Sequence, residues 1–207
     1  MDMLEDIYAK RGRSNRFKDE SPAPELIHEL IYKTYKLVAS KQNLMPYRIH
    51  VLGPDCKKYK EELYKLTTTA VPEPFFRTTK NTQVFAPWVL IFTARLADPN
   101  ESVQKLIEKN HQYKCCFPET YLESGPLRTA CIEIGMWSKL FTGLCLEQDM
   151  DVSYLKCFKS WSSDWSQLPF VVDPPLFVMA VGYHKNQKHI IGETKPDYSE
   201  VVCFEHE

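Results

Sequence analysis

The sequence predicts an α+β fold in which helices wrap around a small central sheet that is mixed but mainly antiparallel. Two continuous apolar runs, residues 88–93 and 175–183, have the length and composition of strands covered on both faces. Residues 126–146 form a longer, weakly charged stretch. Drawn as a helix, it carries large apolar side chains on most of its faces, which indicates a core helix buried on nearly all sides. Residues 25–38 carry apolar side chains at helical spacing, as expected of a helix packed on the sheet.

The first part of the chain alternates helices with one strand. Residues 3–10 predict a short helix, and a basic turn follows it. The segment Ser21-Pro22-Ala23-Pro24 favours the start of the helix at residues 25–38, because serine caps helices and proline suits their first turn. Residues 48–52 alternate in polarity and predict a strand that ends at Gly53-Pro54.

The remaining elements are assigned in the same way. Charged residues with helical spacing at 57–68 predict a helix, and the prolines and threonines of residues 70–83 predict a loop. The strand at residues 88–93 is the expected centre of the sheet. Further helices are expected at residues 103–113 and 154–165, and an edge strand near residues 201–204. We expect one domain over residues 1–207.

Composition excludes several classes of protein. The 26 basic and 27 acidic side chains give a formal charge of −1, whereas a general nucleic-acid binder has an excess of Lys and Arg. No apolar run is long enough to span a membrane, and the acidic first residues do not favour a secretory signal. Seven cysteines without CxxC spacing favour reduced thiols in the cytoplasm over disulfides or a zinc site.

The most informative stretch is the basic segment Arg11-Gly12-Arg13-Ser14-Asn15-Arg16-Phe17. Guanidinium groups are always charged, and their planar set of donors suits a phosphate or the polar edge of a flavin-like ring. The alternative interpretation is a solvated basic turn at the end of a helix, where the helix dipole favours cations. The order of the other segments decides between them.

That order resembles the nitroreductase family of FMN-dependent oxidoreductases over nearly the whole chain. In the family an early R-[RH]-S-x-[RK]-x-[FY] segment binds the flavin phosphate and ring. Arg13, Ser14 and Arg16 match it, and Gly12 stands where an arginine is usual, a position that Arg11 could fill by a shift of one residue.

The family's next motif is a P-S-x-x-N-x-Q-P-[WF] loop, which reaches the flavin across a dimer interface. Residues 39–47 are similar to it. Ser40, Asn43, Pro46 and Tyr47 agree, while Ala39 and Met45 replace the usual Pro and Gln. Without the resemblance, this stretch would read as an ordinary loop between a helix and a strand.

Later segments extend the resemblance. Ala86-Pro87 is like the segment that opens a core strand of the family, and Val181-Gly182-Tyr183 is like the end of its last strand. Lys195 would be the basic residue on the phosphate. Met150-Asp151-Val152 stands where the family commonly has a glycine-containing element whose backbone approaches the flavin N5.

The resemblance implies a cytoplasmic homodimer with FMN at its interface, which passes reducing equivalents from NADH or NADPH to a small electron-poor acceptor such as a nitroaromatic or quinone. Arg13, Ser14 and Lys195, with Arg11 as a candidate, would hold the phosphate. Arg16 would lie near N1 and O2 of the ring, and Ser40 and Asn43 would reach it from the partner.

No side chain is expected to act as a covalent catalyst, and no metal, nucleic acid or membrane is expected to bind. The departures at Gly12, Ala39, Met45 and Asp151 leave an alternative open. In it, the chain is a nitroreductase-like dimer that binds flavin or a partner protein without reductase activity.

Overall fold

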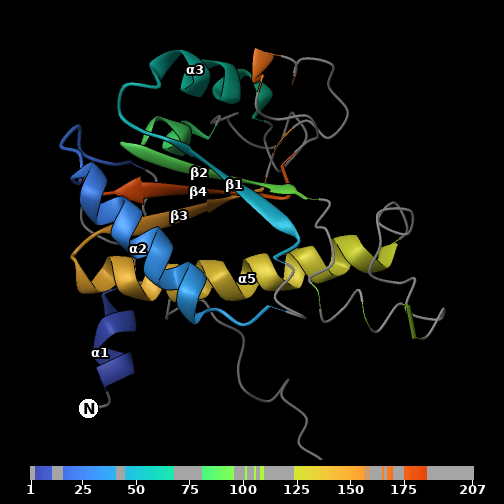
Figure 1. Cartoon of the computed structure of the whole chain (residues 1–207). Helices are drawn as coiled ribbons and strands as arrows, with labels where there is room; N and C mark the ends of the chain where they lie inside the picture. Colours follow the sequence, from blue (N-terminus) through green and yellow to red (C-terminus); the bar gives the residue numbers. More distant parts are fainter. Residues whose placement is uncertain are drawn as a thin grey trace, which may run out of the picture.

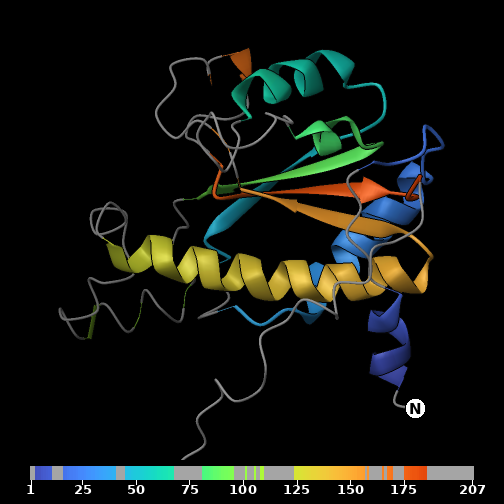
Figure 2. The ribbon, with the colours of Figure 1, turned by 180° about the vertical axis from the view of Figure 1, so that it is seen from behind.

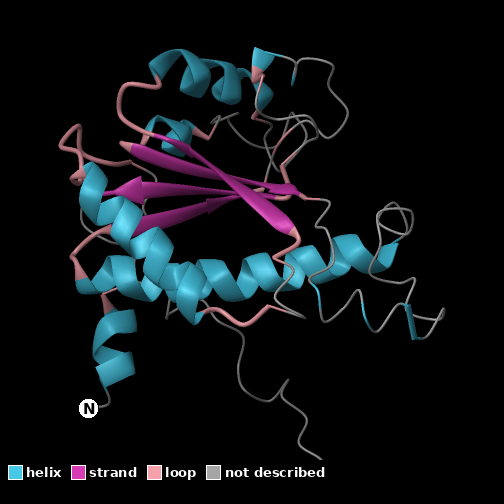
Figure 3. Ribbon diagram, viewed as in Figure 1, coloured by secondary structure: helices cyan, strands magenta, loops and turns pink. Residues whose placement is uncertain are grey.

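The computed structural model describes residues 3–10, 16–40, 45–67, 81–95, 124–156 and 175–185, with residues 101, 105, 108, 109, 158, 165 and 167–169. In these residues the elements follow the order α1 (Met3–Ala9), α2 (Pro24–Leu37), β1 (Tyr47–Leu52), α3 (Lys57–Leu66), the 3-10 helix η2 (Thr82–Phe85), β2 (Trp88–Ala94), α5 (Ser124–Glu147), β3 (Asp151–Leu155) and β4 (Phe177–Gly182). Figure 3 shows how helices and strands are distributed. The structure is therefore α+β, as predicted.

The described strands form one sheet in the order β1-β2-β4-β3, with the apolar strands β2 and β4 at its centre. All three neighbouring pairs are antiparallel, and residue pairs such as His50 with Ile91 and Leu90 with Met179 set their register. The prediction of a mainly antiparallel sheet is confirmed for these strands. The predicted edge strand at residues 201–204 lies outside the described residues.

Helices cover both faces of the sheet (Figure 1). α3 and η2 lie on one face, and α2 and α5 lie on the other; the view from behind agrees (Figure 2). Successive side chains of β2 alternate between the two layers. Leu90 and Phe92 pack toward α2 and α5, while Val89 and Ile91 pack in the cluster that contains Leu63 of α3. Both faces being buried explains why this strand is apolar throughout.

The layer between α5 and the sheet is rich in aromatic side chains. Trp137 is fully buried, with its ring stacked on Phe141 at 4.8 Å and edge-on to Phe92 at 5.2 Å. Ile27 and Leu30 of α2 belong to the same cluster. Burying side chains of this size contributes about 1.5–3 kcal/mol each relative to exposure, so this layer holds α2 and α5 on the sheet.

Two sequence-based predictions are wrong. The helix expected at residues 154–165 does not form at its start, because Tyr154 and Leu155 belong to β3 and pair with Met179 and Val178 of β4. This pairing lies far along the chain, so local spacing does not reveal it.

The helix expected to be buried nearly all round, which is α5, exposes Ile132 by 56% and Met136 by 45%. Apolar residues on this side are therefore not explained by the core of one chain.

The described parts of the helix expected at residues 103–113, residues 105, 108 and 109, are helical. Most of the predicted 70–83 loop lies outside the described residues. In the part of the chain that the structure describes, no helix is both long and apolar enough to cross a bilayer.

Candidate functional site

The basic segment is attached to the chain just beyond β4. The Lys18 amide donates to the Tyr183 carbonyl at 2.7 Å, and the Lys185 amide donates to the Arg16 carbonyl at 3.1 Å. Phe17 and His184 form the antiparallel bridge between these two bonds. The backbone of Arg16 is thus fixed, while its side chain is exposed. Arg11, Arg13, Ser14 and Lys195 lie outside the described residues.

Gly182 allows this attachment. A Cβ at Gly182 would lie 2.9 Å from Pro87 Cδ and 3.3 Å from Phe17 Cδ1, closer than carbon atoms pack. The ring of Phe17 therefore rests directly on the backbone of β4, and any larger residue would displace it. This is a physical reason for the glycine in Val181-Gly182-Tyr183.

At its N-terminal end, the basic segment follows α1, and α1 is held against α5. The Tyr8 hydroxyl donates to the Lys139 carbonyl at 3.0 Å, and Lys139 Nζ lies 3.5 Å from the centre of the Tyr8 ring. Lys10 forms an ion pair with Asp149 at 3.2 Å. Residues 11–15 are consequently bounded by two anchored segments, α1 and the strip at 16–18.

The second predicted motif is a loop that starts at the end of α2. Ser40 Oγ accepts a hydrogen bond from the Met45 amide at 2.9 Å, and the Met45 carbonyl accepts one from the Tyr47 amide at 2.7 Å. Met45 has a positive φ of 45°. The Ser40 hydroxyl thus joins the two described ends of this loop through its oxygen, and a hydroxyl that accepts a hydrogen bond can also donate one. Asn43 lies outside the described residues.

Met45 and Tyr47 of this motif point into the core. Met45 is 8% exposed, and its sulfur lies 3.7 Å from the Tyr47 hydroxyl. Burial, followed by the charges of Glu133 and Tyr35, raises the pKa of Tyr47. Tyr47 is therefore a neutral core residue at physiological pH. The Met45 thioether cannot offer the amide that the glutamine of the similar motif would provide.

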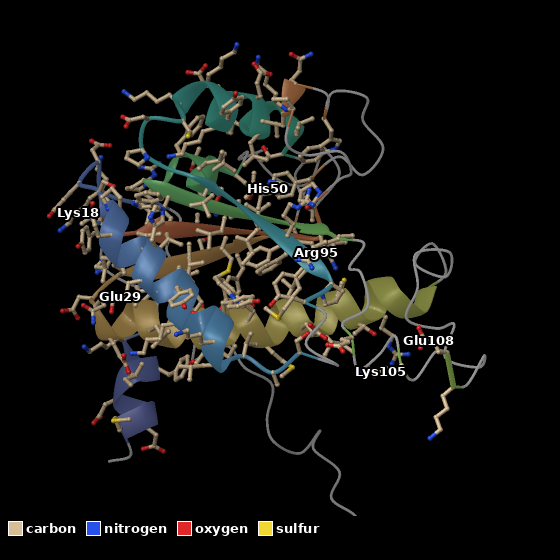
Figure 4. All side chains as sticks on the ribbon, viewed as in Figure 1. Lys18, Glu29, His50, Arg95, Lys105 and Glu108 are labelled. Carbon is tan, nitrogen blue, oxygen red and sulfur yellow. The ribbon has the colours of Figure 1, made fainter. Side chains whose placement is uncertain are left out.

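The two predicted groups of residues lie at opposite ends of the sheet. Arg16 is beside the end of β4, where Val181 faces Trp88 at the start of β2; the Ser40 loop leads into Tyr47, which faces Ala94 at the end of β2. Seven strand residues span about 20 Å. In Figure 4, Lys18 marks the first end and Arg95, whose amide bonds to Pro46, marks the second. One chain alone does not bring Arg16 and Ser40 together.

Asp151 does not lie where a ligand could reach it. It opens β3 opposite Gly182, is fully buried, and accepts a hydrogen bond from the Val152 amide at 3.2 Å. Burial, then the Asp151 carboxylate, raises the pKa of the neighbouring Cys145 thiol well above its usual value. The Asp151 carboxylate is therefore enclosed in the core beside Cys145 and is not presented at the surface.

A groove of about 220 Å³ lies between α5 and the adjoining ends of β3 and β4. It is lined by Cys131, Ile134, Gly135, Ser138, Lys156, Leu176 and Phe177. Lys156 comes directly after β3, and Phe177 begins β4, so the groove is at the same end of the sheet as the Ser40 loop. Sequence reasoning missed this site because its lining comes from three separate segments.

Among the residues that the structure describes, no group of three or more His, Cys, Asp or Glu side chains could hold a metal ion. The three ion pairs of this part of the chain do not involve Arg16 or Lys156. Arg16 and Lys156, one beside each end of the sheet, are both exposed.

Comparison with solved structures identifies the fold. A nitroreductase family protein from Streptococcus pneumoniae superposes with a TM-score of 0.68 and 16% identity, over 97% of this chain and 98% of that one. A Staphylococcus epidermidis protein described as an NAD(P)H:FMN oxidoreductase superposes with a TM-score of 0.69 and 16% identity, over 99% of this chain and 96% of that one. An Exiguobacterium sibiricum protein described as a nitroreductase, solved with FMN, superposes with a TM-score of 0.67 and 15% identity, over 99% of this chain and 98% of that one.

No family model matches the sequence, and no curated protein matches it at a significant level. The chain nevertheless has the nitroreductase fold, as its sequence motifs predicted.

Proposed function

We propose that this chain, which has the nitroreductase fold, is an FMN-dependent oxidoreductase that passes reducing equivalents from NADH or NADPH to an electron-poor acceptor such as a nitroaromatic or quinone. The observation that carries the proposal is the fold match over nearly the full length of both chains, which includes a protein solved with FMN. The retained basic segment at the end of β4 supports it.

The described donors suit a flavin mononucleotide. The Arg16 guanidinium is exposed on a backbone that is held by hydrogen bonds at the Arg16 carbonyl and at the Lys18 amide, so it can pair with negative charge on the ring without much loss of backbone entropy. Lys185, whose amide donates to the Arg16 carbonyl, is a further exposed cation at this end of the sheet. Arg11, Arg13, Ser14 and Lys195 are the proposed phosphate ligands, and all four lie outside the described residues.

The proposed site requires two copies of the chain. Ser40 and Asn43 can contact a flavin held near Arg16 only if they come from another subunit, since the Ser40 loop and Arg16 lie beside opposite ends of β2, a strand about 20 Å long. The side of α2 and α5 turned away from the sheet carries exposed apolar groups, with Tyr32 at 59%, Tyr35 at 54% and Ile132 at 56% exposure. An antiparallel homodimer through this face would cover them and complete two sites.

In this scheme FMN supplies the redox chemistry when it is bound, and the chain's own side chains bind and orient it. The Arg16 cation would stabilise negative charge at one edge of the ring. The Ser40 hydroxyl would donate its hydrogen to polar atoms of the ring. The fully buried Cys145 and the neutral Tyr47 take no part, because neither reaches a surface.

One observation favours the second candidate, a dimer that binds flavin or a partner protein without reductase activity. Met45 replaces an amide-bearing residue in the similar loop, and its side chain is buried in the core. A flavin held there would lose one hydrogen-bonding partner, which weakens binding by about 0.5–1.5 kcal/mol.

The test is an FMN titration of three proteins, followed by addition of NADH and of NADPH under anaerobic conditions. We expect Arg16→Ala to weaken FMN binding about tenfold, since a charge-assisted contact is worth about 1.5 kcal/mol or more. Lys18→Ala, an exposed cation two residues away, is the matched control and should bind as the wild type does. Bound FMN that neither NADH nor NADPH bleaches would favour the second candidate.

A further inference from the structure

Lys60 is a buried cation on the side of α3 that faces the sheet. It shares this side with the apolar residues Leu63 and Leu66, and only 4% of its surface is exposed. Burial lowers the pKa of Lys60 to about 8, so the group still carries its charge at neutral pH. A buried charge is costly, and an apolar side chain would fill the same place without that cost. Packing of α3 therefore does not explain the lysine.

The Lys60 ammonium holds the short stretch that leads into β2. It donates to the Ala86 carbonyl and to the Pro87 carbonyl, both at 2.8 Å. Pro87 directly precedes β2, and its nitrogen has no hydrogen to donate, so this part of the backbone can be held only through its carbonyl groups. Because each peptide unit is planar, binding two consecutive carbonyls fixes the orientation of both units. Lys60 thus sets where the Pro87 ring lies on the sheet.

The Pro87 ring meets the basic segment over the end of β4. A Cβ placed on Gly182 would lie 2.9 Å from Pro87 Cδ and 3.3 Å from Phe17 Cδ1, so both rings rest on the same glycine. Phe17 follows Arg16 directly in the chain. A continuous series of contacts therefore joins the Lys60 ammonium to the backbone of Arg16.

We propose that Lys60 is a positioning residue, which sets the place of Arg16 at the end of the sheet through its two bonds to the stretch before β2. It acts through other residues and touches no ligand itself, because it is enclosed under α3. α3 lies on the face of the sheet opposite to α2 and α5, so this link does not involve the proposed dimer face (Figure 1). Its consequence for flavin binding rests on the proposed function.

The test compares Lys60→Met with two control variants. Methionine keeps an unbranched apolar stem but cannot donate to the two carbonyls. Lys58→Met removes a cation from the exposed side of the same helix. Ile27→Val removes a buried methyl group from the core on the other face of the sheet, and so lowers the stability of the whole chain without altering the contacts of Pro87.

Two amide hydrogens report how firmly the strip at 16–18 is held. The Lys18 amide donates to Tyr183 and the Lys185 amide donates to Arg16. Their hydrogen exchange is measured in the protein as purified and compared with that of the amides of β2. We expect Lys60→Met to speed exchange at both positions about tenfold relative to β2, because bonds from a charged donor are lost. Neither control should change this ratio.

FMN titration of the flavin-free protein is the second measurement. Lys60→Met should weaken FMN binding about fivefold in the wild type but less than about twofold in Arg16→Ala, because Lys60 acts on the flavin through Arg16. A general loss of stability would instead weaken binding equally in both backgrounds. Lys58→Met and Ile27→Val should bind FMN as the wild type does.

Equal exchange of the Lys18 and Lys185 amides in Lys60→Met and Lys58→Met would overturn the proposal. A loss of FMN affinity that is the same with and without Arg16 would also overturn it. Protein that retains FMN and shows no effect of Lys60→Met removes the positioning role alone. Faster exchange of the two amides in protein that never retains FMN supports the link between α3 and the strip, and removes the proposed function instead.

Discussion

Replacing Gly182 by alanine tests how the basic segment is held. The new Cβ would lie 2.9 Å from Pro87 Cδ, 3.2 Å from Pro87 Cγ and 3.3 Å from Phe17 Cδ1. Carbon atoms pack at about 3.5–4.0 Å, so at least one neighbour has to move by about 0.5 Å. The Pro87 ring is tied to the backbone before β2 and cannot rotate away, so the end of β4 has to shift away from it. The strip around Phe17, which is hydrogen-bonded to residues 183 and 185, has to adjust with it.

Overpacking of this kind costs about 1–3 kcal/mol, and the lower entropy of alanine in the unfolded chain offsets about 0.5 kcal/mol of it. We expect a net loss of about 1.5 kcal/mol in the free energy of unfolding, which for a chain of this length lowers Tm by about 3–6 °C. Because Phe17 carries the backbone of Arg16, FMN binding should weaken about fivefold in the folded variant.

Urea unfolding measures the stability, and fluorescence titration with FMN measures the binding. Gly135→Ala is the matched control, since its Cβ meets no atom within 4 Å and alanine favours a helix; it should raise stability by about 0.5–1 kcal/mol. If Gly182→Ala is as stable as the wild type and binds FMN equally well, the reasoning about this contact is refuted.

Three further predictions concern other contacts. Gly143→Ala should destabilise the wild type, because the new Cβ would lie 2.9 Å from the Tyr8 hydroxyl. In a Tyr8→Phe background the same change should stabilise the protein by about 0.5 kcal/mol, since alanine favours a helix. A double-mutant cycle measured by urea unfolding that shows no coupling between the two positions would contradict this. Lys60 is buried, and its ammonium group donates to the Ala86 and Pro87 carbonyls. Burial lowers the pKa of Lys60 to about 8. Between about pH 8 and 10.5 the unfolded chain therefore binds more protons than the folded one, and the free energy of unfolding should rise with pH in this range. Unfolding curves of the wild type should show this rise relative to Lys60→Met, and parallel pH profiles would refute it. Ile132→Glu on the exposed side of α5 should shift sedimentation from dimer to monomer while leaving the monomer folded, whereas an unchanged dimer would exclude this face as the interface.

The sequence predicts most of the fold because the core elements carry strong local patterns. The apolar run at residues 88–93 and the helical stripe at 25–38 became β2 and α2 with ends shifted by one residue. β3 was missed because five residues that include Asp151, Ser153 and Tyr154 do not alternate clearly, and only pairing with β4 makes them a strand. The exposed side of α5 could not be recognised either, because apolar residues facing a partner and those facing a core have the same spacing.

The candidate site was only partly predictable for a similar reason. Motifs identify Arg16 and Ser40 as residue types suited to a flavin, but not their positions at opposite ends of a sheet. That separation follows from strand order, which no short segment specifies. The groove depends on residues as distant as Cys131, Lys156 and Phe177, so no motif predicts it. The roles of Arg11, Arg13, Ser14, Asn43 and Lys195 stay predictions.

The most direct test of the account is the visible absorbance spectrum of the purified protein, repeated after addition of excess FMN and removal of the free flavin by desalting. The account predicts a retained oxidised-flavin spectrum with FMN equimolar to the chain, bleached by NADH or NADPH. A colourless protein that does not keep added FMN would contradict it, and the nitroreductase fold would then serve another purpose in this chain.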